Sequence, residues 1–125
     1  MDRKINVTIY NEFYHESTKE EVRAIYPQGI HGVLRSFLEK DEMIGTIRCA
    51  TLYDHEEKLT QEVPDVTDVL TWWGHVKHEE ASDAVIAMVH KRELSGMGLN
   101  ALHSAHASKL MMRLLGTESY WLRWR

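Results

Sequence analysis

Short apolar segments alternate with stretches of helical spacing along the sequence, and this alternation constrains the fold more than any other feature. Apolar and polar residues alternate from Ile5 to Tyr10, which is typical of a strand. Strands that alternate with helices form a mainly parallel sheet, so we predict a single α/β domain. The near-continuous apolar run from Asp68 to Gly74 further predicts a strand that is covered on both faces. The predicted strands are residues 5–12, 44–53, 68–74 and 99–103.

Capping residues and apolar spacing predict the helices. Ser17 and Thr18 each precede a glutamate by three residues, so either can open a short helix with a capping box. The last helix is expected to stop at Gly116, because glycine readily adopts the left-handed conformation. A polar link that contains Pro64 joins the second strand to the third. The predicted helices cover about residues 17–26, 30–40, 82–94 and 105–115.

Charge and cysteine content limit the partners of the protein. The formal net charge is -4 and the isoelectric point is about 6.0, so no basic surface is available for nucleic acid or anionic lipid. The single cysteine, Cys49, excludes an internal disulfide and suits a reducing compartment. The N-terminal residues lack the apolar run of a signal peptide, and no stretch approaches membrane-spanning length. We therefore expect a cytoplasmic protein with no nucleic-acid or membrane partner.

Histidines gather at the predicted strand ends. The carboxyl ends of parallel strands share one edge of the sheet, and ligands bind at that edge. Six of the eight histidines are expected there, so they form a candidate acid–base or metal site. A single loop histidine is more often a solvated or capping residue, but this many together favour a functional site. The groups expected at the edge are Glu12 with His15, Asp54 with His55, His75 with His78, and His103 with Ser104 and His106.

Two His-x-x-His pairs suggest a divalent metal, zinc or manganese. Imidazole is a common ligand for such ions, and a catalytic metal needs three protein ligands and one open position. Neither pair has a fixed third ligand in the sequence, which favours the alternative of metal-free acid–base catalysis. Glu12 is then expected to be the base or to support a histidine. The candidate metal ligands are His75, His78, His103 and His106.

Ser104 lies where the fourth predicted strand turns into a helix. Such a turn resembles a nucleophile elbow, which exposes a hydroxyl above the sheet. No histidine–acid pair follows to activate the hydroxyl, so capping of the next helix or hydrogen bonding to a ligand is favoured over nucleophilic attack. Trp72 and Trp73 are adjacent strand residues that point to opposite faces, so one is expected in the core and the other is left open.

Four short blocks, spread between residues 7 and 109, carry a resemblance to a known family: VTIYNEFYHE (7–16), IYPQGIHG (25–32), LTWWGH (70–75) and GLNALHSAHASK (98–109). Together they resemble the ThuA-like, or trehalose-utilisation, family of the class I glutamine amidotransferase-like superfamily. The resemblance implies a flavodoxin-like three-layer sandwich and a link to disaccharide and keto-sugar metabolism. That superfamily places a cysteine at the elbow, a position we assign to Ser104, so no glutaminase activity is expected. Members of the family are longer, so we expect residues 1–125 to form the N-terminal part of its domain.

Two functions are consistent with these features. One is an enzyme that acts on a disaccharide or keto-sugar, and the other is a non-catalytic sugar-binding or regulatory domain. A domain that lacks its second half would expose apolar surface, so a homo-oligomer is also expected. The predicted catalytic residues are Glu12, His15, His75, His103 and Ser104. The predicted substrate-binding residues are Asn11, Trp73, Ser104, His106 and Lys109.

Overall fold

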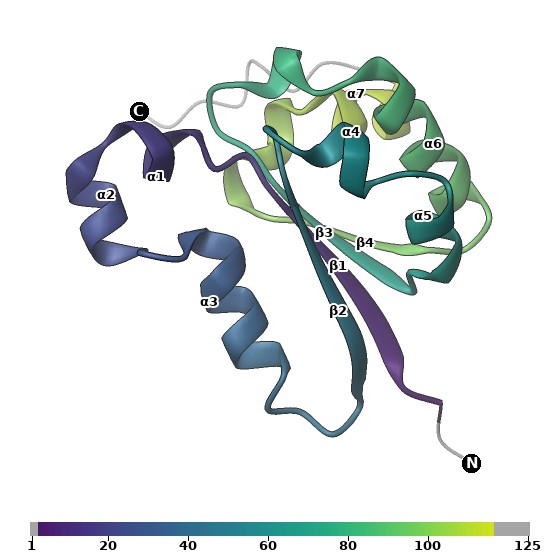
Figure 1. The fold of residues 1–125 in the computed structure, drawn as a ribbon. Helices are drawn as coiled ribbons and strands as arrows, with labels where there is room; N and C mark the ends of the chain where they lie inside the picture. Colours follow the sequence, from purple (N-terminus) through teal and green to yellow (C-terminus); the bar gives the residue numbers. More distant parts are fainter. Residues whose placement is uncertain (1–2, 117–125) are drawn as a thin grey trace.

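A four-stranded sheet forms the centre of the molecule (Figure 1). The computed structural model describes residues 3–116. All strand pairs are parallel, and the strand order is β2-β1-β3-β4. Helices flank the sheet on both sides, so the predicted α/β fold class and the arrangement of a flavodoxin-like sandwich are confirmed. The strands are β1 (Ile5–Asn11), β2 (Ile44–Thr51), β3 (Val69–Trp73) and β4 (Gly98–Ala101).

The helices divide between the two faces of the sheet (Figure 1). One face carries α3 (Gly29–Leu38), which follows α1 (Tyr14–Thr18) and α2 (Glu20–Ile25). The other face carries α4 (His55–Lys58), α5 (Glu62–Val66), α6 (Asp83–Leu94) and α7 (Lys109–Leu115). Two 3-10 helices, η1 (His78–Glu80) and η2 (His103–Ala107), follow β3 and β4. No helix within the described residues is long and apolar enough to cross a membrane.

The main hydrophobic core lies between the sheet and α6. Tyr10 of β1 and Trp72 of β3 stack with ring centroids 3.7 Å apart, and Trp72 is 2 % exposed. Val85 and Val89 of α6 belong to the same buried cluster. Burial raises the pKa of the Tyr10 hydroxyl, and the nearby Glu12 carboxylate raises it further. Trp72 is therefore the core member of the tryptophan pair.

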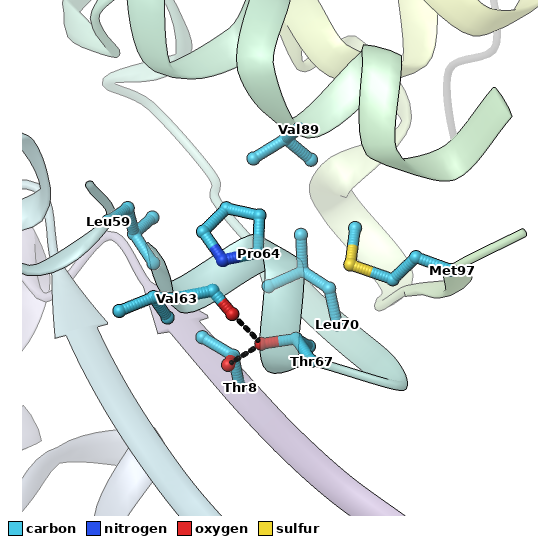
Figure 2. A pocket seen from close by; sticks show the side chains of 8 residues that line it. All are labelled: Thr8, Leu59, Val63, Pro64, Thr67, Leu70, Val89 and Met97. Carbon is cyan, nitrogen blue, oxygen red and sulfur yellow. Dashed lines mark hydrogen bonds between the residues drawn. The ribbon is translucent and has the colours of Figure 1, made fainter. Parts of the chain in front are cut away.

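The predicted polar link between β2 and β3 is instead two short helices that close this core. Figure 2 shows α5 side chains beside a small cavity of about 10 Å³. The Thr67 hydroxyl donates to the Val63 carbonyl at 2.6 Å and lies 2.6 Å from the Thr8 hydroxyl, so the buried oxygens are satisfied. Helices of four and five residues are too short to show a hydrophobic period, which is why the sequence pattern indicated only a link.

The face under α3 is covered less completely. Two residues of the predicted apolar face of this helix, Phe37 and Val33, are 72 % and 49 % exposed. On β3, Leu70 and Trp72 are buried, whereas Val69 and Thr71 are only half-buried. The prediction that this strand is covered on both faces is therefore wrong for the described residues, because α3 packs on β1 and β2.

Helix starts differ from the predicted caps. The chain enters α1 at Tyr14, and the Ser17 and Thr18 hydroxyls donate to the Tyr14 carbonyl instead of opening a helix. Ser108, not Ser104, caps the last helix, since its hydroxyl accepts the Met111 N–H at 3.2 Å. By contrast, the predicted start of the third helix at Ser82, whose hydroxyl accepts the Val85 N–H, and the C-terminal stop at Gly116, with φ 71°, are confirmed.

Candidate functional site

A cavity of about 460 Å³ opens at the carboxyl edge of the sheet, between α1, α2 and the ends of β3 and β4. It brings together five residues that the sequence predicted, from three different strand ends. These are His15, Trp73, His75, His103 and Ser104. The cavity also contains Glu16, Lys19, Val22 and Ile30, which were not predicted. The convergence of histidines at one sheet edge is thus observed for three of the six.

The turn after β1 places Glu16 at the cavity. Phe13 adopts the left-handed conformation, with φ 63°, and its N–H donates to the Asn11 side-chain oxygen at 3.1 Å. The Asn11 amide nitrogen donates to Glu16 Oε2 at 2.7 Å and lies 3.0 Å from His31 Nδ1. Burial lowers the pKa of His31, which favours the neutral ring that accepts this bond. Asn11 is buried and organises the site from below, so it does not contact the cavity as a predicted substrate ligand would.

Glu16 is the functional candidate that sequence reasoning missed. Its side chain is 1 % exposed, and the Ile30 N–H donates to Oε2 at 3.1 Å. The other carboxylate oxygen, Oε1, is buried and has no hydrogen-bond partner among residues 3–116. In sequence, Glu16 stands in an acidic helical stretch and resembles a solvated residue. Its position beside His15, just after a strand end, was the available signal.

Two histidine rings and Trp73 line one side of the cavity. The His15 and His75 ring centroids are 5.2 Å apart, and the Trp73 ring stacks near His75 at 6.3 Å with an interplanar angle of 15°. His15 Nδ1 is buried and finds no partner within the part of the chain that the structure describes. Imidazole is the side chain that most often serves as a general acid or base, so this pair is a candidate for proton transfer.

Glu12 has a different role from the one predicted. Its carboxylate is buried and accepts the backbone N–H groups of His75 at 3.1 Å, Val76 at 3.2 Å and Lys77. Gly74 permits this loop, because a Cβ there would lie 3.0 Å from His78 Nδ1. The Glu12 carboxylate does not line the cavity. Of the predicted roles, the geometry favours the supporting one, in which Glu12 fixes the loop that carries His75, over that of a base.

His103, not Ser104, occupies the turn of the elbow. Among residues 3–116, His103 and Phe13 are the non-glycine residues with positive φ, and the φ of His103 is 37°. Such a backbone costs about 1–3 kcal/mol and collects at functional sites. Both of these residues follow strand ends, and His103 lines the cavity. Ser104 is buried and lines the cavity one residue later, so it remains a candidate to contact a ligand.

Four other predicted residues lie outside the cavity. Lys109 Nζ donates to the Ala81 carbonyl at 2.8 Å and to Asp83 at 2.9 Å, so it ties α7 to the start of α6 and does not contact the cavity. His55 is buried, accepts the Ser82 N–H and donates to the Leu52 carbonyl, which makes it structural. Buried His78 has its pKa lowered by desolvation. Half-buried His106 belongs to η2 and does not line the cavity.

The four candidate metal ligands therefore separate. His75 and His103 line the cavity, whereas His78 and His106 do not. Within residues 3–116, no group of three or more histidine, cysteine, aspartate or glutamate side chains is arranged to hold a metal ion. The predicted site of three ligands, His75 and His103 with either His78 or His106, is therefore not formed among these residues.

The cavity combines groups that move protons with surfaces that bind a small molecule. Three imidazoles and one carboxylate supply donors and acceptors, and Trp73, Val22 and Ile30 supply apolar contact area. Comparison with models of known protein families finds no match for this sequence, and no curated protein matches it.

Proposed function

We propose that this protein binds a disaccharide or keto-sugar in the cavity at the carboxyl edge of the sheet and acts on it by acid–base catalysis. The observation that carries the proposal is the meeting of His15, His75 and His103, from three separate strand ends, around one cavity. The resemblance of four sequence blocks to the ThuA-like family supports a sugar such as trehalose as the ligand class.

The paired rings of His15 and His75 support proton transfer. Their ring centroids are 5.2 Å apart and both rings line the cavity, so both imidazoles can reach the same ligand. One imidazole then serves as acid while its neighbour serves as base, which is what enolisation or elimination next to a sugar carbonyl requires. His103 reaches the same cavity from β4 and is a further candidate for a proton donor or acceptor.

Trp73 supports the choice of a sugar. Its ring is half-buried and lines the cavity, and an indole face packs well against the C–H face of a pyranose. A cavity of about 460 Å³ is within the usual range for a small-molecule site. The apolar platform and the polar rim together suit a ligand with one apolar face and many hydroxyls.

The single cysteine supports a reducing compartment. Cys49 is half-buried on β2, and burial raises the pKa of its thiol, which keeps the group protonated. On this basis we propose a cytoplasmic location. We also propose that the exposed apolar residues of α3 favour a homo-oligomer.

Calorimetry and product analysis test the proposed function. Trehalose, maltose and their keto derivatives are added to the wild type and to His75→Ala and His103→Ala, with and without zinc. We expect the wild type to bind and convert at least one sugar, and each variant to lose about 100-fold in turnover. His90→Ala, on α6 at the opposite face, is the control and should keep full turnover.

Three outcomes separate the alternatives. Turnover without added metal that is lost in both histidine variants supports acid–base catalysis. Binding without turnover supports the non-catalytic sugar-binding domain. Failure of every sugar to bind contradicts the proposed function.

A further inference from the structure

Glu16 lines the cavity and carries a buried acceptor atom without a partner among the described residues. The side chain is 1 % exposed, and Oε1 is buried without a hydrogen-bond partner among the described residues. An unsatisfied buried acceptor is destabilising, and a ligand that donates a hydrogen bond to it recovers that loss. We therefore expect Glu16 Oε1 to accept a hydrogen bond from a bound ligand.

The other oxygen of Glu16 holds the carboxylate in place. Oε2 accepts the Asn11 side-chain amide at 2.7 Å and the Ile30 N–H at 3.1 Å. Ile30 lies in the first turn of α3, a ten-residue helix, where the helix dipole favours a negative charge. These contacts fix Oε2, so Oε1 is the carboxylate oxygen that is left to accept a further hydrogen bond.

His15 adds a second unsatisfied atom next to it. His15 Nδ1 is also buried and unpartnered within residues 3–116, and both residues line the same cavity. A carboxylate oxygen accepts a hydrogen bond, and an imidazole nitrogen accepts or donates one according to its tautomer. Two neighbouring hydroxyls match this pair of atoms.

The charges of the cavity favour a neutral ligand. Lys19 lines the cavity together with Glu16, and the two side chains carry opposite formal charges. A ligand with its own full charge would disturb that balance, whereas a polyol would not.

We infer that Glu16 Oε1 and His15 Nδ1 together bind two neighbouring hydroxyls of a neutral polyol. Glu16 is then the residue that distinguishes a sugar from its deoxy analogue. This inference rests on the proposed function and deepens it, because it names the hydroxyl-recognising group of the same cavity.

Glu16→Gln is the informative variant. Asn11 and Ile30 both donate to Oε2, so the glutamine carbonyl oxygen replaces Oε2 and its NH₂ group replaces Oε1. The substitution thus keeps the internal hydrogen bonds and turns the acceptor in the cavity into a donor. Glu21→Gln, on the exposed surface of α2, is the matched control.

The test measures the affinities of wild type, Glu16→Gln and Glu21→Gln for trehalose and for a set of monodeoxytrehaloses. We expect wild type and Glu21→Gln to bind one or two of the deoxy sugars about 10- to 100-fold more weakly than trehalose. Glu16→Gln should bind trehalose more weakly by a similar factor and bind those deoxy sugars no more weakly than trehalose. Thermal melts confirm that each variant is folded.

The outcomes distinguish this inference from the proposed function. If wild type binds trehalose and every monodeoxytrehalose equally well, the inference is overturned and the proposed function stands. The same holds if Glu16→Gln discriminates as the wild type does. If the wild type binds no sugar but binds a small ammonium compound, both are overturned. Because the deoxy series tests the wild type, a failure of Glu16→Gln to fold leaves the inference testable.

Discussion

The two faces of the sheet differ in how completely helices cover them. On one face, α4, α5, α6 and α7 bury Tyr10, Leu70 and Trp72 almost fully. On the other face, α3 packs on β1 and β2 and leaves Phe37 72 % exposed. The cavity with its histidines borders this second face, at the ends of β1, β3 and β4.

We infer from this difference that one face of the sheet mainly stabilises the fold and that the other face carries the ligand-binding site. The covered face buries large apolar side chains, which contribute most of the free energy of folding. The second face and its edge contain the unsatisfied atoms of His15 and Glu16 and the left-handed residues Phe13 and His103, all of which are destabilising. We therefore expect substitutions on the two faces to affect different measurements.

Trp72 and Trp73 give the largest contrast, because they are neighbours in β3 that point to opposite faces. Trp72→Ala removes a ring that is 2 % exposed and stacked on Tyr10, so it should lower the free energy of unfolding by about 3–5 kcal/mol. Trp73→Ala removes a half-buried ring from the cavity and should cost about 1 kcal/mol of stability, but abolish most sugar binding. Urea unfolding and calorimetry measure the two effects.

If both tryptophan substitutions lower the free energy of unfolding equally, the conclusion that the two faces have different roles is wrong. Unchanged sugar affinity in Trp73→Ala would remove this residue from the site. A Trp72→Phe variant serves as the control, since it keeps an aromatic ring beside Tyr10 and should cost less than the alanine variant.

Glu12 affects both stability and the site, because its buried carboxylate accepts hydrogen bonds from the loop that carries His75. Glu12→Gln replaces an acceptor with an NH₂ group that faces backbone donors, so we expect a loss of about 2 kcal/mol in the free energy of unfolding. The NMR signals of the His75 ring should also shift. Glu20→Gln, which is exposed on α2, is the control. An unchanged His75 environment would show that Glu12 does not position it.

Glu93, on the α6 side of the sheet, is expected to lower the stability of the protein when its carboxyl group is ionised. Burial raises the pKa of this α6 carboxyl from 4.5 to about 7, and its Oε1 is buried without a partner in the described chain. The folded state binds this proton more tightly than the unfolded state, so stability present below pH 4.5 is lost as the pH rises through 7. Because the group is half-buried, solvent screening reduces the loss to about 1 kcal/mol.

Glu93→Gln tests this dependence. The variant should show no corresponding fall in the free energy of unfolding between pH 5 and pH 8 by denaturant titration. A wild-type curve that rises over this interval and is unaffected by the substitution would contradict the assignment to Glu93.

Phe37 should show the smallest effect on stability. Phe37→Ser changes a ring that is 72 % exposed, so the free energy of unfolding should change by less than about 0.5 kcal/mol. Self-association, measured by sedimentation velocity, should weaken because apolar surface is removed. Leu34→Ser, half-buried on the same helix, is the control that should cost more stability. A larger loss for Phe37→Ser than for Leu34→Ser would show that α3 packs differently.

The sequence by itself determined the fold class and the edge of the sheet that carries the site. The alternation from Ile5 to Tyr10 and the glycine at 116 are local signals, and local backbone preferences act between near neighbours. The parallel topology then places the carboxyl ends of the strands on one edge. His15, His75 and His103 were predicted there because each comes just after a predicted strand.

Only the tertiary structure decided which polar residues face the cavity. Glu12 and Glu16 are the same residue type four positions apart, yet Glu12 accepts N–H groups from a loop more than 60 residues away, whereas Glu16 lines the cavity and has one oxygen without a partner among the described residues. His75 and His78 separate in the same way, because His78 is buried beside Gly74. The physical reason is that a polar side chain takes its role from the donors and acceptors around it, and most of these come from distant parts of the chain.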